Sequence, residues 1–480
     1  MITVVALLVA AALAGCGTTT YFAGRTLPPS GIANRVLIAI QNPSALTTGT
    51  LQFVDAYYDI RFKYNSANTG PAFNIAGYSG SLPITIQNMP EELGGAVYST
   101  GDGSFSLLSY NQEKLLSTVS GLNGRSSSIF TTRNQSYVFA ASQSSHVLTV
   151  VDKSATSPGS YPLNLPGVYR VSVNPGGSMA LAFAQNSNYV YYPRKLSAAQ
   201  SLAYSGGPAT WPKAAVDCEP QNAPGWCLFQ AQSPDKIDAT GNYYGAPLAF
   251  DRPVKAVFSA DGGTAYVLNC GPECGGVASS ISLLPVAPII FLIGQQSGTL
   301  PTTGALASST ISIPGGASNA LVDSSTLYVV GQALSSGYWG GNLTVVNLST
   351  NKISIPAVSI SDGAPGTLSR MLLADDNTLW IGMTGCINGE RANNGLPYGC
   401  LTMYNTSTNK VTLLEPYIGD ATGIAAVTGL HKIYTAEGGQ VYIYSTVDGT
   451  AIDNQYVTVT GTAYDVAYMD AISDEDNTVY

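Results

Sequence analysis

Charged side chains are scarce in this sequence of 480 residues. Lysine, arginine, aspartate and glutamate make up 10 % of it, against roughly 25 % in an average soluble domain. The net charge is −9, and the basic residues form no cluster. Proteins that bind nucleic acids neutralise phosphates with such clusters, so we expect no nucleic-acid partner.

Histidine is rarer still, with only His146 and His431 in the chain. This weakens any hypothesis that needs a histidine-based triad or a metal site with several histidines. The sequence also lacks a dinucleotide-binding glycine motif, a phosphate-binding loop, an H-E-x-x-H motif and a G-x-S-x-G motif. We therefore assign no catalytic residue, no metal and no cofactor.

Long segments with helical periodicity and caps are also missing. Hydrophobic residues nevertheless make up 45 % of the chain, which is enough to bury a core and excludes general disorder. With 51 glycines and 29 tyrosines, the surface has to be built mainly from hydroxyl, amide and phenol groups. This composition favours β-structure and a location outside the cytoplasm.

Six of the seven cysteines form three close pairs. Each pair encloses glycine or proline, which allows the segment between the cysteines to turn back: Cys218 with Cys227, Cys270 with Cys274, and Cys386 with Cys400. We predict three local disulfides, formed in an oxidising compartment. Free thiols or a bound metal are the alternatives, but the spacing differs from that of zinc knuckles and no histidine is near.

The seventh cysteine, Cys16, follows an apolar run over residues 2–13 that is too short to span a membrane. The phrase "LAGC" at 13–16 resembles the lipobox of bacterial lipoproteins. The resemblance implies a signal peptide over 1–15, a lipid on Cys16 and a flexible tether over 16–33. Because Gly17 rather than aspartate follows the cysteine, it also implies the outer membrane of a bacterial cell envelope. The alternative is a buried N-terminal strand with an incidental cysteine.

The remainder, 34–480, is predicted to be one all-β domain of repeated strands. The clearest copies lie at 326–355 and 378–413, and their hairpins "NLSTNKISI" and "NTSTNKVTL" agree at five of nine positions. Each unit contains about four strands with alternating apolar and polar residues, which is typical of a β-propeller blade.

Repeat units begin near residues 84, 127, 168, 254, 318, 368, 422 and 463. Eight starts predict eight four-stranded blades, with seven as the alternative. Because the chain begins with middle strands and ends with an inner one, we expect the two ends to complete one blade together. The segment 186–252 is either a long insertion in one blade or an additional degenerate blade.

The Tyr-Val strands and "STNK" hairpins resemble the YVTN family of β-propeller repeats and, more broadly, the lactonase-like propellers. The resemblance is clear over 326–470 and weaker over 84–325. Some members of that superfamily are lactonases or lyases, which act at the mouth of the central channel. Such enzymes are expected to gather two carboxylates, or a histidine and a carboxylate, at the channel.

Aromatic residues gather in the expected loops and are candidates for stacking on sugars or peptides. They are Trp211, Trp226, Tyr243, Tyr244, Tyr338, Trp339 and Tyr398. Packing around the disulfides explains them equally well. The sequence thus predicts a surface-tethered, non-catalytic propeller that binds a protein or glycan partner, with a lactonase- or lyase-like enzyme as the alternative.

Overall fold

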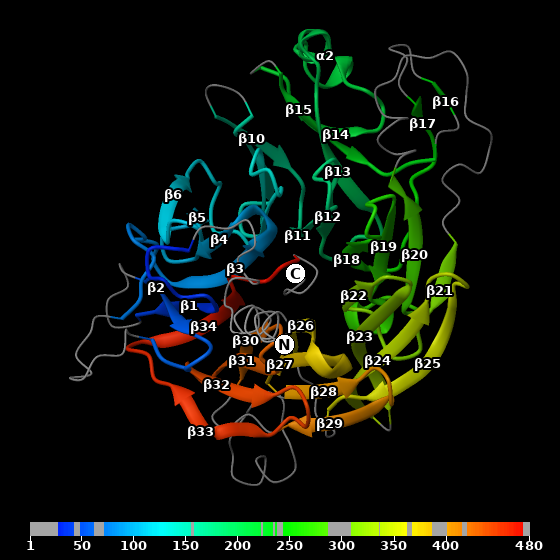
Figure 1. The fold of residues 1–480 in the computed structure, drawn as a ribbon. Helices are drawn as coiled ribbons and strands as arrows, with labels where there is room; N and C mark the ends of the chain where they lie inside the picture. The colour runs from blue at the N-terminus through cyan, green and yellow to red at the C-terminus, as the bar shows by residue number, and fades with distance from the viewer. Residues whose placement is uncertain are drawn as a thin grey trace, which may run out of the picture.

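The structure is a computed structural model of the chain. It describes residues 27–42, 49–61, 72–154, 158–221, 224–233, 236–237, 243–286, 309–335, 337–361, 367–385, 401–414 and 420–473. Eight antiparallel sheets are arranged as blades around a central axis (Figure 1). This confirms the all-β propeller and its eight blades, and excludes the seven-bladed alternative.

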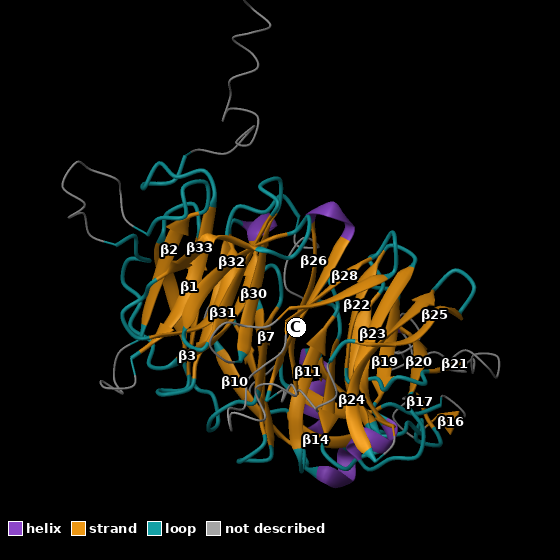
Figure 2. Cartoon of the chain, turned by 90° about the horizontal axis from the view of Figure 1, so that it is seen from below, coloured by secondary structure: helices purple, strands orange, loops and turns teal. Residues whose placement is uncertain are grey.

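The first strand of each blade lies next to the axis, and the following strands step outward (Figure 1). Figure 2 shows the blades from the side, with loops at the ends of the strands. Blades 2 and 3 are built from β3 (Pro83–Met89), β4 (Gly94–Ser99), β5 (Ser104–Ser109), β6 (Lys114–Val119), β7 (Ser128–Thr131), β8 (Tyr137–Ser142), β9 (Val147–Asp152) and β10 (Gly159–Asn164). Blades 5 and 6 are built from β18 (Pro253–Phe258), β19 (Thr264–Asn269), β20 (Ser280–Pro285), β21 (Thr310–Ser312), β22 (Asn319–Asp323), β23 (Thr326–Ser335), β24 (Tyr338–Asn347) and β25 (Lys352–Ser359). Blades 7 and 8 are built from β26 (Thr367–Ala374), β27 (Thr378–Thr384), β28 (Leu401–Asn405), β29 (Lys410–Leu414), β30 (Ala421–Val427), β31 (Lys432–Glu437), β32 (Gln440–Ser445) and β33 (Ala451–Val457).

Blade 1 closes the ring, as predicted. The C-terminal strand β34 (Thr462–Tyr468) is its inner strand and pairs with β1 (Arg35–Gln41), which pairs with β2 (Thr50–Asp55). A buried ion cluster reinforces this closure: Arg35 contacts Asp470 at 2.6 Å and Glu113 of blade 2 at 2.9 Å. The same Glu113 accepts hydrogen bonds from the backbone amide and hydroxyl of Ser30, which holds the incoming chain against blade 2.

In blade 4, strands from the described part of 186–252 join one enlarged sheet instead of forming a separate blade. This sheet has five strands in the order β11 (Val168–Val173), β12 (Ala180–Ala184), β13 (Val190–Lys195), β15 (Trp226–Gln230) and β14 (Ala215–Glu219). The insertion also carries α2 (Ala198–Tyr204), η2 (Pro208–Thr210) and the hairpin of β16 (Lys236–Ile237) with β17 (Tyr243–Tyr244). A capping box between Ser197 and Gln200 begins α2.

Two of the three predicted disulfides lie in the described residues, and both are formed. Cys218–Cys227 joins directly opposed residues of β14 and β15 in the inserted part of blade 4. Cys270–Cys274 closes the turn η3 (Gly271–Cys274) beside the channel. Cys386 and Cys400 lie outside the described residues, as do Cys16, the predicted signal peptide and most of the tether, so these remain predictions.

The core is divided between the blades. Buried hydrophobic residues form eight clusters, one between each pair of neighbouring blades. Between blades 7 and 8, for example, the fully buried Trp380 packs against Tyr444 with ring centroids 6.2 Å apart. Fully burying one large apolar side chain contributes about 1.5–3 kcal/mol, and a blade achieves this on both faces only inside the closed ring. Among the described residues, no helix has the length and apolarity required to cross a membrane.

Candidate ligand site in the central channel

Most inner strands contain a β-bulge near their first residues. A register shift interrupts six of them near their first residues: β3, β11, β18, β26, β30 and β34. Bulges of this kind bend a strand and redirect a side chain. In β11, β18 and β26 the residues directly after the shift are Arg170, Lys255 and Arg370, and all three line the channel.

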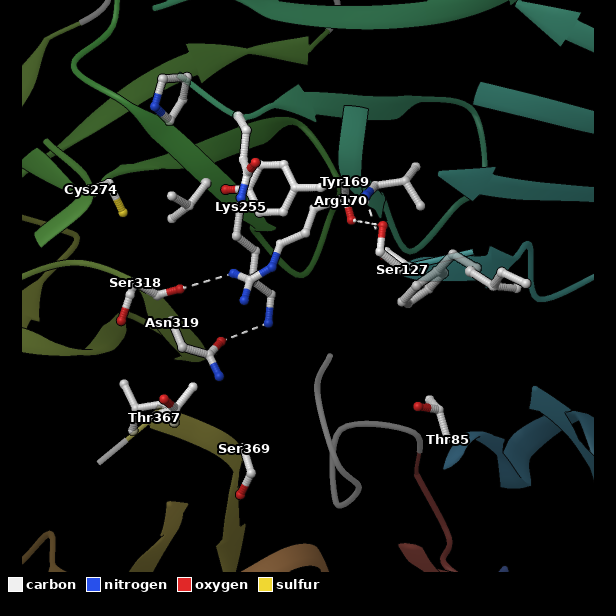
Figure 3. Close-up of a pocket in the computed structure, with 18 of the residues that line it drawn as sticks. Thr85, Ser127, Tyr169, Arg170, Lys255, Cys274, Ser318, Asn319, Thr367 and Ser369 are labelled. Carbon is white, nitrogen blue, oxygen red and sulfur yellow. Dashed lines mark hydrogen bonds between the residues drawn. The ribbon is translucent and has the colours of Figure 1, made fainter. Parts of the chain in front are cut away.

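These residues border a cavity of about 540 Å³ in the channel (Figure 3). Inner-strand residues from blades 2 to 7 line it, among them Thr85, Ser128 and Asn319. Four of its described lining residues are cationic, namely Arg170, Arg252, Lys255 and Arg370, whereas one is a carboxylate, Glu273. The site therefore favours an anion.

Lys255 is the most deeply buried of these cations. Its side chain is 6 % exposed, and its Nζ donates a hydrogen bond of 2.7 Å to Oδ1 of Asn319 on the next blade. Within the described chain, no carboxylate lies close enough to form an ion pair with it. Burial, reinforced by the positive charges of Arg170 and Arg370, holds the pKa of the Lys255 ammonium well below its ordinary value.

Arg170 comes from the neighbouring blade and reaches into the same cavity (Figure 3). Its Nη1 lies 3.5 Å from the carbonyl oxygen of Ser318, and its guanidinium lies 5.6 Å from the centre of the Tyr169 ring. These are weak, neutral contacts for a guanidinium, which binds carboxylates and phosphates through two parallel hydrogen bonds. Arg170 is thus placed to bind an anion that enters the cavity.

Arg370 differs because its charge is balanced. Its Nη2 contacts Oδ2 of Asp465 at 2.9 Å, and that buried oxygen also accepts the backbone amide of Ile86 at 2.7 Å. Burial raises the pKa of the Asp465 carboxyl, an effect that the Arg370 guanidinium opposes. Arg370 and Asp465 therefore join blades 7 and 1, while Arg170 and Lys255 remain the basic side chains available to a ligand.

Glu273 is the cavity's one described carboxylate. It lies in η3, which the Cys270–Cys274 disulfide closes, and it accepts a hydrogen bond of 2.9 Å from the backbone amide of Gln332. Burial raises the pKa of this carboxyl. The small disulfide loop thus positions a lining residue of the channel, a role that its sequence alone does not indicate.

The aromatic residues proposed from the sequence whose side chains the structure describes lie outside this cavity. None of Trp211, Trp226, Tyr244 and Trp339 lines the cavity. Trp226 is 4 % exposed and packs edge-on against Tyr137 at 5.4 Å, so its ring belongs to the core between blades 3 and 4.

The other three described rings are half-buried. The indole N–H of Trp211 donates to the carbonyl of Tyr204 at 3.2 Å, and Lys213 lies 4.6 Å from the centre of the Tyr244 ring. Trp339 lies in β24 of blade 6. The side chains of Tyr243 and Tyr338 and the whole of Tyr398 lie outside the described part of the chain.

Both histidines lie on exposed hairpin turns with positive φ, at 57° for His146 and 55° for His431. No sequence motif marks Arg170, Lys255 or Arg370. The only signal in the sequence is one basic residue near the start of each otherwise apolar inner strand, in "VYRVSV", "VKAVFS" and "SRMLLA". Their convergence depends on the ring.

No protein-family model and no curated protein sequence matches the chain. Solved structures do. Dihydro-heme d1 dehydrogenase NirN in complex with DHE is 11 % identical with a TM-score of 0.52, covering 91 % of this chain and 75 % of NirN. The likeness is one of fold.

Two other solved structures have similar folds. Apo AztD from Citrobacter koseri is 10 % identical with a TM-score of 0.47, covering 91 % of this chain and 97 % of AztD. A putative 6-phosphogluconolactonase from Bacteroides fragilis is 11 % identical with a TM-score of 0.42, again covering 91 % and 97 %. At these identities, proteins of one fold carry unrelated functions.

Proposed function

We propose that this protein is a non-catalytic binding protein of the bacterial cell envelope, and that its central channel binds an anionic ligand. The observation that carries the proposal is the pair Arg170 and Lys255. Both reach into one cavity, and neither forms an ion pair within the described chain. A bound carboxylate or phosphate can accept hydrogen bonds from both side chains and balance the excess of basic residues in the cavity lining.

The envelope location rests on separate observations. The two disulfides are typical of an oxidising compartment, and the lipobox-like phrase ending at Cys16 supports a lipid anchor. The resemblance of its hairpins to YVTN repeats supports a propeller of the lactonase-like type. Both partner classes expected from the sequence can carry an anionic group. A glycan can present an anionic sugar to the channel, and a protein can present an acidic side chain.

A lactonase- or lyase-like enzyme remains the second hypothesis, but no specific observation favours it. We expected such an enzyme to gather two carboxylates, or a histidine and a carboxylate, at the channel mouth. The described lining residues instead contain cations, amides and hydroxyls around Glu273. These side chains can bind and orient an anion, which supports a binding function.

The test is thermal unfolding in the presence of phosphate, acetate and larger carboxylates at matched ionic strength. A ligand at about 100 times its Kd stabilises the folded state by about 2.7 kcal/mol, which raises the melting temperature. The double variant Arg170→Gln/Lys255→Gln should lose this increase. A matched control, Lys410→Gln on the exposed outer strand β29, should retain it. Equal shifts in the double variant and in the wild type would refute the channel as the site.

A further inference from the structure

We infer that Lys255 is a nucleophile that captures the carbonyl group of an anionic ligand as an imine, with Arg170 holding the anionic group. The ligand class is therefore a small aldehyde or ketone that carries a carboxylate or a phosphate. This inference rests on the proposed function, because anion binding is what brings the carbonyl to the amine.

The surroundings of Lys255 are those of a reactive lysine rather than of an ordinary ion-pair lysine. Its Nζ reaches the cavity wall, is more than nine-tenths buried and has the amide oxygen of Asn319 as its hydrogen-bond acceptor. The guanidinium groups of Arg170 and Arg370 also lie in the cavity lining, and their positive charges disfavour an ammonium at Lys255. Desolvation beside other cations is a recognised way to keep a lysine uncharged and nucleophilic at neutral pH.

Asn319 supports this assignment. Its Oδ1 accepts from Nζ at 2.7 Å, which fixes the position of the amine without supplying a negative charge. It also accepts the backbone amide of Ala320 at 2.9 Å, which holds the Asn319 side chain in place. A carboxylate at this position would instead stabilise the ammonium form. The amine is thus oriented and left with its lone pair available.

The reaction needs no oxidant, reductant or metal. The Nζ lone pair attacks the carbonyl carbon, a C–N bond forms, and the C=O π electrons move to oxygen. The two amine hydrogens then leave with that oxygen as one molecule of water, and the C=N bond remains. The capture is reversible by hydrolysis, so it is compatible with a binding protein.

Arg170 defines the second half of the ligand. A guanidinium presents its donors in a planar fork that matches the oxygens of a carboxylate or phosphate. Because Arg170 and Lys255 occupy equivalent positions on adjacent inner strands, a small ligand that carries both a carbonyl and an anionic group suits the pair. The cavity of about 540 Å³ admits small molecules of this kind.

The experiment is reductive trapping on the full chain. The protein is incubated with cyanoborohydride and either pyruvate, for the carboxylate class, or glyceraldehyde 3-phosphate, for the phosphate class. Peptide mapping then measures the labelling rate of each lysine. We expect Lys255 to be labelled at least about tenfold faster than the exposed Lys410, because a larger fraction of its amine is uncharged. Because aldehydes and ketones differ in intrinsic reactivity, the probe with the larger ratio of labelling at Lys255 to labelling at Lys410 identifies the ligand class.

Three variants sharpen the test. Lys255→Met replaces the amine by an apolar side chain of similar length and should abolish labelling at this peptide, with a wild-type circular dichroism spectrum as proof of folding. Arg170→Gln should reduce labelling by pyruvate more than labelling by uncharged acetaldehyde. Lys410→Gln should leave labelling at Lys255 unchanged.

The failure modes are distinguishable. If phosphate or carboxylates stabilise the protein but Lys255 is labelled no faster than Lys410, the imine is refuted and the anion site stands. If no anion stabilises the protein in the thermal assay, the proposed function and this inference both fail.

Discussion

The ion cluster around Arg35 predicts how strongly ring closure depends on a single side chain. The Arg35 side chain is 3 % exposed and donates two hydrogen bonds to Asp470, one to the carbonyl of Tyr110 and one to Glu113. Burial by itself would lower the pKa of this guanidinium, but hydrogen bonds and charge from Asp470 and Glu113 outweigh it and raise the pKa. The cluster thus connects both ends of the chain to blade 2.

Arg35→Met should destabilise the protein by about 3–5 kcal/mol, because the variant leaves Asp470 and Glu113 buried without their cation. Arg35→Lys keeps the charge but loses the planar fork, so its loss should be intermediate. Urea unfolding followed by tryptophan fluorescence measures both as shifts of the midpoint.

The matched control is the surface ion pair between Arg133 and Glu91, which are 3.4 Å apart and 38 % and 40 % exposed. Solvent screens such pairs, so Arg133→Met should cost less than about 1 kcal/mol. A comparable loss in Arg35→Met and Arg133→Met would refute the argument that burial gives the closure cluster its strength.

Three further predictions concern separate parts of the chain. Gly316→Ala should destabilise the fold by at least about 2 kcal/mol in urea unfolding, because its φ is 88° and a Cβ would lie 2.4 Å from the backbone oxygen of Gln332. The control is Gly337→Ala, where φ is 85° but a Cβ would meet no atom within 4 Å. That variant should lose only the backbone strain of about 1 kcal/mol. The hydrogen bond to Asp376 raises the pKa of His431, so its small contribution to stability is complete below about pH 6.5 and is lost as the pH rises through the folded-state pKa. Asp376→Asn should lower that pKa in an NMR titration, and an unchanged titration would contradict the assignment. Cys16→Ala should release the protein from the membrane fraction into the soluble fraction, and retention with an intact N-terminus would exclude the lipid anchor.

The repeat architecture could be predicted from the sequence because its signals are local. The alternation of residues in a strand and the turn that follows it are both contained in about ten residues. The eight predicted starts match the inner strands β3, β7, β11, β18, β22, β26, β30 and β34. Ring closure was also predictable, since an inner-strand phrase at one end and middle strands at the other each lack a partner. The cysteine pairs of β14–β15 and of η3 followed in the same way from short spacings.

The insertion and the aromatic residues needed the tertiary structure. Strands β14 and β15 extend one blade, because β15 pairs with β13 and β14 lies at the outer edge. The pattern of residues within a strand does not determine which other strand it pairs with. Trp226 reads as a loop aromatic, yet its strand carries it into the core between blades 3 and 4. A periodicity indicates a strand, but it does not indicate which sheet that strand joins.

By itself the sequence determined the strand repeat, the number of blades and the way the two ends meet, because each depends on patterns within single blades. Only the tertiary structure decided the candidate site. Arg170, Lys255 and Arg370 are separated by 85 and 115 residues in the chain, and each stands alone in its own strand. They share one cavity because bulges at equivalent positions aim them at the axis, and because ring closure brings those positions together.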